Sequence, residues 1–385
     1  MAFATIGTRA ITDGAIATAD IADNAVTSAK TSGIPVRPNA KPLIINGDCA
    51  VAQRNTSVTS LTSSGAVQTV DRINNEITNI GTYTVAQESL SSGEAYNNGF
   101  RKAWRIDCTT ADASPAAGDN LYVTYSFEGQ DLQLFKKGTA NAEKFTLAFW
   151  IKSNKTGTGQ VNLRDNDNSR LIGGTYTISS ADTWEHKVIN FAADTSGAFD
   201  NDNGRSMDIE WWLDSGTTYS SGATPTAWEA FSQADRNASG TLDIADNTAN
   251  DWAITGIQLE VGEYTSSTLP PFQHEDFGDN LARCQRYFQK VAAAMVVANH
   301  TGGTLANGAT NINPMRANPT AGQTGTLTIN DNGVANFTQS SESITLAGGS
   351  KEGIEFGINN FSGMTAYRVM RMREGGEDIT LSAEL

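Results

Sequence analysis

The fold is decided by the stretch Phe145-Thr-Leu-Ala-Phe-Trp-Ile-Lys152. Its large apolar side chains alternate with other residues, so that every second residue from Phe145 to Ile151 shares one face of an extended chain. A period of two is the pattern of a β-strand with one face in a core, whereas a helix would need a period near 3.6. The stretch therefore predicts a strand whose second face, with Trp150, points away from the core.

Other stretches repeat this alternation in the manner of an antiparallel sandwich. Residues 121–127 and 207–213 alternate in the same way, and 254–261 supplies a further apolar run. Clusters of Asn, Asp, Ser and Gly separate these runs, which is typical of turns between short strands. The pattern predicts a mainly β protein in which residues 43–272 form a jelly-roll β-sandwich.

The first thirty residues carry a repeat of five residues that fits neither a helix nor a flat strand. One aliphatic residue in five cannot form a core within a single chain, but several copies side by side can bury the column at a shared axis. We therefore expect residues 1–30 to form a homotypic stalk, most simply threefold; the alternative is a disordered linker with a chance period. The column consists of Ile6, Ile11, Ile16, Ile21 and Val26.

Composition and spacing define three further segments. Residues 31–42 contain three prolines, which disfavour helix and central-sheet pairing, so this segment is expected to be a linker. Residues 273–299 are expected to contain a connector helix that is capped by Asp276 and runs from about 279 to 294. Residues 300–385 hold several short strand-like runs and are expected to form a small C-terminal β domain.

Charge and cysteine usage exclude several classes of partner. The 385 residues include 42 acidic and 27 basic side chains, a net charge of −15, which repels phosphate backbones and anionic lipid heads. Three widely spaced cysteines form no disulfide or zinc pattern, and Cys284 on the predicted helix is expected to be buried and inert. The longest apolar run, 291–298, is too short to cross a bilayer. No signal peptide is visible, so we expect the protein to be made in a cytoplasm and not exported by the usual route. We also expect that it neither binds nucleic acid nor inserts into a membrane.

Short motifs with a family character are spread along the chain. The sandwich segment opens with Asn46-Gly-Asp48 and closes with Ile254-Thr-Gly-Ile-Gln-Leu-Glu-Val-Gly262, and Leu281-Ala-Arg-Cys-Gln-Arg-Tyr287 follows. With Asp20-Ile-Ala-Asp-Asn-Ala-Val-Thr-Ser-Ala-Lys30 in the repeat, these motifs resemble bacteriophage tail-fibre proteins that have a carbohydrate-binding-module-like jelly-roll domain. The resemblance touches nearly the whole chain. It implies a virion structural protein, usually a trimer, and it transfers neither a receptor nor a catalytic motif.

The predicted outer faces of the strands carry aromatic side chains beside carboxylates. A sugar ring can stack on a flat aromatic group while its hydroxyls donate to carboxylates, so these faces form a candidate glycan-binding site. The alternative is that a neighbouring subunit or a loop covers the aromatic residues. The candidates are Tyr122, Trp150, Asp208, Glu210 and Trp212. Asp208 and Glu210 could also serve as the paired carboxylates of a glycoside hydrolase, but we expect the protein not to be an enzyme.

Residues 235–246 follow the ligand spacing of a calcium-binding loop. Oxygen-bearing side chains recur along it, and Gly240 stands at the sixth position, where the tight turn of such a loop needs glycine. The candidate ligands are Asp235, Asn237, Ser239, Thr241, Asp243 and Asp246. Because the last ligand is Asp and not Glu, and loops of this composition are frequent in this chain, a chance match is the alternative. No other cofactor is expected.

Taken with the resemblance, these patterns predict a homotrimeric tail fibre of a virion. Its N-terminal segment would attach to other tail proteins, and its β domains would bind a glycan of the host cell surface, with three tethered copies raising the avidity. Two alternatives stay open at this point: a tail-associated polysaccharide depolymerase, and a head fibre or decoration protein.

Overall fold

The computed structural model describes residues 41–63, 67–292, 297–302, 304–330, 335–339, 344–349, 352–364, 369–372 and 378–385. The predicted stalk lies outside these ranges, together with all but the last two residues of the predicted linker. The stalk and its threefold packing therefore stay predictions. The residues of the predicted column that fall outside the described ranges are Ile6, Ile11, Ile16, Ile21 and Val26.

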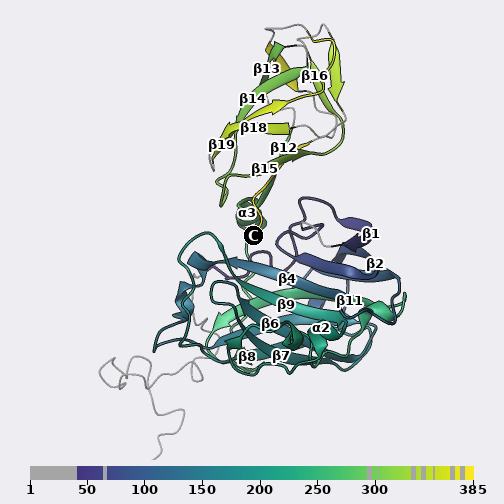
Figure 1. Cartoon of the computed structure of the whole chain (residues 1–385), viewed down its shortest axis with the longest axis vertical. Coiled ribbons are helices and arrows are strands. Elements are labelled where there is room, and N and C mark those ends of the chain that lie inside the picture. The colour runs from purple at the N-terminus through teal and green to yellow at the C-terminus, as the bar shows by residue number, and fades with distance from the viewer. Residues whose placement is uncertain are drawn as a thin grey trace, which may run out of the picture.

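The sandwich is one antiparallel sheet of eleven strands that curls on itself (Figure 1). In the order of hydrogen-bonded neighbours the sheet runs β10-β7-β6-β9-β4-β2-β3-β11-β5-β8, and β1 pairs with β2. This architecture confirms the predicted mainly β, jelly-roll fold. The strands are β1 Ser57–Ser63, β2 Asn74–Ser89, β3 Lys102–Thr110, β4 Asn120–Glu128, β5 Phe145–Ser153, β6 Gly157–Asp165, β7 Arg170–Ile178, β8 Glu185–Phe191, β9 Arg205–Ser215, β10 Glu229–Ala230 and β11 Asp251–Val261. The connections carry the short helices α1 Glu94–Asn97 and α2 Thr217–Ser220 and the 3-10 turns η3 Gly129–Asp131, η4 Gln133–Phe135, η5 Gln233–Asp235 and η6 Ile244–Asp246.

Strand β2 carries the sheet from one layer of the sandwich to the other. Its first part, Asn74–Thr78, pairs with β4, and its second part, Thr82–Ser89, pairs with β3. Between the two parts Asn79 and Gly81 have positive φ angles of 51° and 72°, a conformation that glycine adopts without strain. The bend at this point lets a single sheet supply both walls of the core.

The core lies between these two layers and is lined by the predicted stripes. Every second residue from Phe145 to Ile151 is fully buried, as predicted, and the stripes in β4 and β9 are buried as well. Phe149 of β5 meets Trp211 of β9 edge-on, with ring centroids 5.9 Å apart, and Tyr176 of β7 at 5.2 Å. Edge-to-face contacts of this kind add to the free energy of apolar burial. Aromatic side chains thus join the two layers across the core.

The C-terminal domain consists of a three-stranded sheet, β12-β21-β15, and a seven-stranded sheet, β17-β16-β20-β13-β14-β19-β18. Its core includes Phe356, Met370, Met372 and Leu381, each no more than 2% exposed, so it buries apolar side chains separately from the sandwich. The strands are β12 Phe288–Ala292, β13 Val297–Gly302, β14 Leu305–Asn311, β15 Thr320–Gln323, β16 Leu327–Asn330, β17 Asn336–Gln339, β18 Ile344–Gly349, β19 Gly353–Ile358, β20 Val369–Met372 and β21 Asp378–Ser382.

The connector helix is shorter than its spacing predicts. Helix α3 spans Phe277–Gln285, and its cap is confirmed because the Asp276 side chain accepts a hydrogen bond from the Gly278 amide at 2.8 Å. The predicted continuation to residue 294 is wrong: the chain enters strand β12, which pairs along its length with β21. Strand pairing with a segment some ninety residues away overrides the helical spacing. Within the described ranges no helix is both long and apolar enough to cross a membrane.

Cys284 on α3 is buried, as predicted, at 1% exposure. Burial raises the pKa of its thiol well above the usual range, and a thiol that stays protonated is a poor nucleophile. The predicted burial of Cys284 is confirmed, and its inertness stays a prediction that the raised pKa supports.

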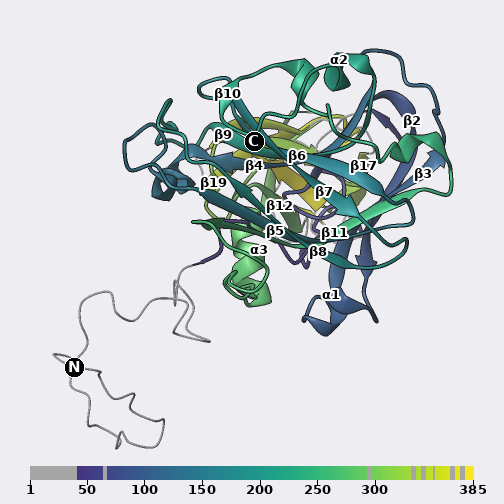
Figure 2. The same ribbon diagram turned by 90° about the horizontal axis from the view of Figure 1, so that it is seen from below.

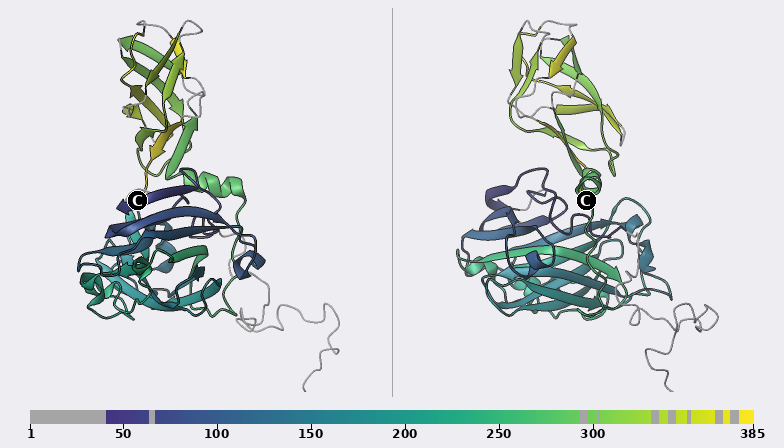
Figure 3. Two further views of the ribbon diagram at one scale, coloured as in Figure 1. Left: turned by 90° about the vertical axis from the view of Figure 1, so that its right-hand side faces the viewer. Right: turned by 180° about the vertical axis from the view of Figure 1, so that it is seen from behind.

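Helix α3 lies between the sandwich and the C-terminal domain (Figure 3). Directly after it, Arg286 donates from Nε and Nη2 to the two carboxylate oxygens of Glu128 at 2.7 and 2.5 Å. The Tyr287 hydroxyl donates to the same carboxylate at 2.6 Å. Glu128 ends strand β4 and its side chain is fully buried, so these bonds tie the end of the sandwich to the start of the C-terminal domain.

We predict that Gly81→Ala lowers the free energy of unfolding by about 1–3 kcal/mol, because a residue with a Cβ is strained at this positive φ. The added Cβ would also lie 2.5 Å from the Thr110 carbonyl oxygen. Urea denaturation measures the loss. The matched control is Gly118→Ala, where a Cβ would meet nothing within 4 Å and the change should be close to zero. Equal effects of the two substitutions would contradict the role of the β2 bend.

Candidate functional site

The aromatic residues predicted on the outer face of β4 and β9 do lie together there. The rings of Tyr122 and Trp212 are stacked, with centroids 4.5 Å apart and an interplanar angle of 15°. Trp212 is 0% exposed, so the alternative in which something covers this aromatic residue is the one found. The guanidinium of Arg236 lies 4.5 Å from the Trp212 ring centroid and 4.8 Å from that of Tyr122. A sugar could reach the Trp212 ring only by displacing this arginine.

Arg236 belongs to the segment between β9 and β11, which folds back over the outer face of the sheet. Its Nε and Nη2 donate to the Glu210 carboxylate at 3.0 and 2.8 Å, and the Trp212 indole donates to it at 3.1 Å. Burial alone would raise the pKa of Glu210, but the charge and hydrogen bonds of Arg236 outweigh it and hold the pKa below its usual value. Of the two covers that the sequence left open, a loop of the same chain is the one found.

Asp208, the other predicted carboxylate on β9, is also buried and paired. Arg205 donates from Nε and Nη2 to its two oxygens at 2.7 Å each, and Asn166 donates at 2.9 Å. A glycoside hydrolase needs a carboxylic acid with a raised pKa at an open cleft, whereas Asp208 and Glu210 are each 1% exposed or less. This arrangement does not suit the pair for hydrolysis.

Trp150 lies apart from the other predicted residues. It stands on β5, in the opposite layer, and its ring stacks on that of His186 with centroids 4.9 Å apart. The two residues are direct partners in the β5–β8 ladder, and both are half-buried. The predicted glycan-binding residues therefore lie in two places. Tyr122, Asp208, Glu210 and Trp212 lie on β4 and β9, and Trp150 lies beside β8.

The predicted calcium ligands form hydrogen bonds and ion pairs with different segments of the chain. Asp235 accepts a hydrogen bond from the Ala223 amide at 2.8 Å, and Asp246 forms an ion pair with Lys155 and accepts from the Asn250 amide group at 2.7 Å. In the described ranges, no three or more His, Cys, Asp and Glu side chains cluster to hold a metal ion. Calcium binding by this loop stays a prediction. The six candidates are Asp235, Asn237, Ser239, Thr241, Asp243 and Asp246.

Strands β7 and β8, which are both labelled in Figure 2, contact each other. An open groove of about 460 Å³ is lined by residues of both strands and of the loop after β11. These strands stand near the two ends of the sheet order, and among the described strands β8 pairs with β5 alone. Gly174 lets the two strands approach, since a Cβ there would lie 2.7 Å from the Ile189 side chain. The groove is lined by Thr175, Tyr176, His186, Lys187, Val188, Ile189, Asn190, Tyr264, Thr265 and Ser266.

Asn190 positions one wall of this groove. Its amide group donates to the Tyr264 carbonyl at 2.9 Å, and its oxygen accepts from the Tyr264 backbone amide at 3.2 Å and from the Thr146 hydroxyl at 2.6 Å. These bonds fix the loop that follows β11 against the end of β8. The Tyr264 ring is thereby held at the groove, half-buried.

His186 gives the groove a neutral hydrogen-bonding group. Burial lowers the pKa of its imidazole below the usual value, and the Lys187 ammonium lowers it further, so the ring is uncharged at pH 7. A neutral imidazole presents one donor and one acceptor, and its stacking on Trp150 holds the ring in place. The Lys187 ammonium forms an ion pair with Glu185 at 2.6 Å. The lining contains no Asp or Glu.

No pattern in the sequence identifies the residues that line the groove. Which strands end a sheet depends on pairing between distant segments, and periodicity does not report it. The nearest indication was the predicted outward direction of Trp150, because its partner in the β5–β8 ladder, His186, lines the groove.

Comparison with protein-family models and with curated proteins finds no match. Among solved structures the chain is similar to the enzymatically active domain of tailspike protein 4 of bacteriophage CBA120, at 10% identity and a TM-score of 0.30, over 57% of this chain and only 21% of that one. A putative sugar binding protein of Bacteroides thetaiotaomicron matches at 12% identity and a TM-score of 0.30, over 57% and 100%. A family 22 carbohydrate binding module of Clostridium thermocellum matches at 11% identity and a TM-score of 0.27, and the match covers 51% of this chain and 89% of that one. Likenesses this distant transfer no residue and no activity.

We predict that Arg236→Ala lowers the free energy of unfolding by about 3 kcal/mol, because it removes the hydrogen-bonded guanidinium from the buried Glu210. The remaining cation is Arg164, whose Nη1 lies 3.7 Å from Glu210 and whose side chain is 32% exposed. Chemical denaturation at pH 7 measures the loss. The control is Lys144→Ala, which removes an ion pair with Glu263 whose side chains are 50% and 56% exposed; its loss should stay below about 1 kcal/mol.

The pH dependence of the Arg236→Ala loss tests its cause. A carboxylate with a lowered pKa in the folded state contributes stability above its usual pKa and loses it as the pH falls. The difference between the parent and the variant should therefore shrink from pH 7 to pH 4. The same difference at both pH values would show that the loss comes from packing and not from the ion pair.

Proposed function

We propose that this protein is a non-enzymatic glycan-binding protein, and that the groove between β7 and β8 contacts the glycan. The observation that carries the proposal is the groove itself, about 460 Å³ and open to solvent, with hydroxyl, amide and imidazole groups along its walls. Ligand sites of small molecules fall at about 300–1,000 Å³ and combine apolar surface with a few placed polar groups. The groove has room for a short oligosaccharide segment.

The lining favours a neutral, hydroxyl-rich ligand. His186 is uncharged at neutral pH, and the one cationic side chain, Lys187, is paired with Glu185. Sugars present hydroxyls that both donate and accept and C–H faces that pack on rings, and the rings of His186 and Tyr264 line the groove. A nucleic acid or an anionic lipid would instead have to approach a chain of net charge −15.

We extend the proposal to the whole chain as a homotrimeric tail fibre of a bacteriophage. Its support is the sequence resemblance and the five-residue aliphatic column, which several copies can bury together. In this arrangement the N-terminal segment contacts other tail proteins of the virion, the fibre is made in the host cytoplasm, and the grooves of three copies bind a glycan of the host surface with added avidity.

The groove predicts which substitutions impair glycan binding. On an array of bacterial surface polysaccharides, the parent should bind a subset, and His186→Ala and Tyr264→Ala should each weaken the binding about tenfold or more, since each removes a ring and its hydrogen-bonding group. Phe277→Ala, which removes an aromatic side chain that is 58% exposed on α3, is the control and should bind like the parent. No binding to any polysaccharide, or equal binding by all variants, would contradict the proposal.

The stalk predicts the mass in solution. Light scattering after size exclusion should give three times the 40.9 kDa of one chain, and replacing Ile6, Ile11 and Ile16 by Asp should shift the protein towards monomers, because charged side chains cannot be buried at a shared axis. Circular dichroism of the variant is the control that the sandwich stays folded. A parent that is monomeric at micromolar concentration would contradict the trimer.

A further inference from the structure

One lysine is buried beside two carboxylates at the end of strand β6. The Lys137 ammonium lies 2.5 Å from Oδ2 of Asp165 and 3.1 Å from Oδ2 of Asp194. The side chains of Lys137 and Asp165 are 0% exposed and that of Asp194 is 5% exposed. Among the described residues no other lysine is buried. Lys137 follows η4, Asp165 ends β6 and Asp194 follows β8, so the fold brings together three groups that lie far apart in the sequence.

Aromatic rings and backbone carbonyls enclose the lysine and keep water away from it. Its Nζ lies 5.1 Å from the ring centroid of Phe199 and 5.0 Å from that of Trp228. It also donates to the carbonyls of Ser196 and Gly197 at 3.1 and 2.6 Å. A buried ion pair carries a desolvation penalty for each of its charges, and a neutral amide made from the same two groups does not.

The two oxygens of Asp165 have different surroundings. Oδ1 accepts hydrogen bonds from the backbone amide of Asn168 at 3.0 Å and from its side-chain amide at 3.3 Å. Oδ2 faces the Lys137 ammonium, and the Asn168 side chain reaches it at 3.0 Å. When an amine attacks a carboxyl carbon, negative charge gathers on the oxygen that stays, and donors aimed at that oxygen stabilise the intermediate. Oδ1 has such donors, and Oδ2 lies beside a source of protons.

Asp194 is placed to accept a proton from the lysine. Burial alone would raise the pKa of Asp194, but hydrogen bonds from Arg170, from the Ser196 amide and from Lys137 hold it below its usual value, so this carboxylate is ionised at pH 7. At 3.1 Å from Nζ it lies within the range in which a general base takes a proton. A lysine that has lost this proton is a nucleophile.

We propose that Lys137 and Asp165 condense to an amide between their side chains, with Asp194 as the general base. The Nζ–Cγ bond forms and the Cγ–Oδ2 bond of Asp165 breaks. Of the three protons of the ammonium, one stays on the amide nitrogen and two pass to Oδ2, one of them by way of Asp194, so that Oδ2 leaves as water. No oxidant, cofactor or further reactant is needed. Groups that are held in contact react as if at a very high concentration, and the enclosed site releases the water.

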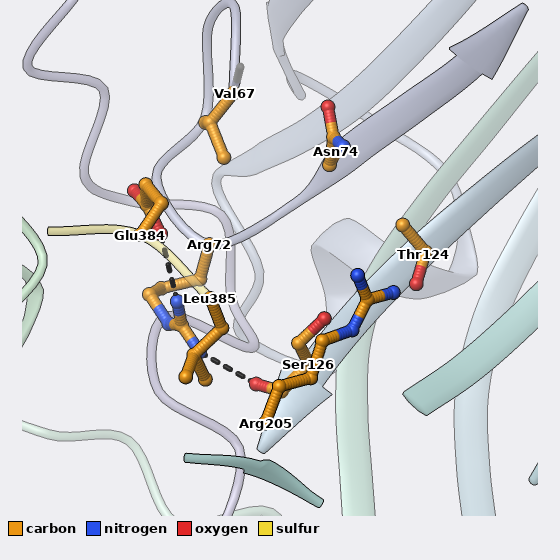
Figure 4. A pocket seen from close by; sticks show the side chains of 8 residues that line it. All are labelled: Val67, Arg72, Asn74, Thr124, Ser126, Arg205, Glu384 and Leu385. Atoms are coloured by element: carbon orange, nitrogen blue, oxygen red, sulfur yellow. Dashed lines mark hydrogen bonds and ion pairs between the residues drawn. The ribbon is translucent and has the colours of Figure 1, made fainter. Parts of the chain in front are cut away.

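The need for an amine separates this pair from the other ion pairs of the chain. The buried pair of Arg72 with Glu384, 2.8 Å apart (Figure 4), uses a guanidinium, which does not lose its proton in proteins. Lys144 lies 2.5 Å from Glu263, but their side chains are 50% and 56% exposed, so water competes for both groups. The proposal is independent of glycan binding at the groove and survives its failure.

The test is mass spectrometry of the denatured full chain and of its proteolytic digest. We expect the chain to be lighter than its sequence by one water molecule, and the digest to contain a branched peptide that joins the segments of Lys137 and Asp165. Lys144 and Glu263 are the control within the same digest and should appear in separate, unmodified peptides. If Lys137 and Asp165 also appear in separate peptides after prolonged incubation of the folded protein, the proposal is overturned.

Three variants test the chemistry. Lys137→Arg keeps the charge but removes the amine, so its mass should equal that of its sequence. Asp165→Asn should give the same branched peptide as the parent, because the amide then forms with loss of ammonia in place of water. Asp194→Asn removes the base and should slow the linkage about tenfold or more. A folded Asp194→Asn chain that links as fast as the parent would contradict the role of Asp194. The digest of the parent decides the proposal even where a variant fails to fold.

Discussion

Most of the charged side chains that are buried on the sandwich lie against a charge of the opposite sign, and part of the sheet is covered by the segments that bring these charges. Glu210 is covered together with Arg236, and Asp165 with Lys137, whose Nζ lies 2.5 Å from its carboxylate and whose side chain is fully buried. An unpaired charge at these depths would cost several kcal/mol. The segment that brings Arg236 lies over the outer face of β6 and β9, where its backbone carbonyls also accept hydrogen bonds from Gln160 and Asn162. Lys137 instead pairs with Asp165 on the side of β6 that faces the core. The groove between β7 and β8 has no residue of the Arg236 segment in its lining.

The same constraint acts between the two domains. Arg72 donates to the Ser126 carbonyl in the sandwich and to the Glu384 carboxylate in the C-terminal domain, at 2.6 and 2.8 Å, and its guanidinium lies 3.5 Å from the Tyr287 ring centroid. Cation–π contact and charge-assisted hydrogen bonds reinforce each other in a site closed to water. Together with the Glu128 pair, this arginine links the two domains through charges that separation of the domains would leave unpaired.

Features set by neighbouring residues could be predicted from the sequence, whereas features set by contacts between distant segments could not. The stripe from Phe145 to Ile151 was predicted correctly, because a period of two is a local property of the chain. The outward direction of Trp212 was also right, but its cover was not predictable, since Arg236 reaches it from the far end of a loop whose path no periodicity reports. The helix was extended too far because Phe288 belongs to a strand that pairs with β21, near the end of the described chain. The groove at His186 could not be found, because the order of strands in the sheet is set by distant pairings.

These constraints also bear on how the proposed fibre would use its grooves. Strands β7 and β8 lie on the side of the sandwich away from the C-terminal domain (Figure 1), so the docked domain does not cover the groove. Multivalent binding gains most when the sites are held at a separation that their targets can match, and it is lost when the geometry forbids simultaneous contact. The ion pairs of Glu128 with Arg286 and of Glu384 with Arg72 hold the sandwich against its C-terminal domain, so a movement that opened this junction would leave buried charges unpaired.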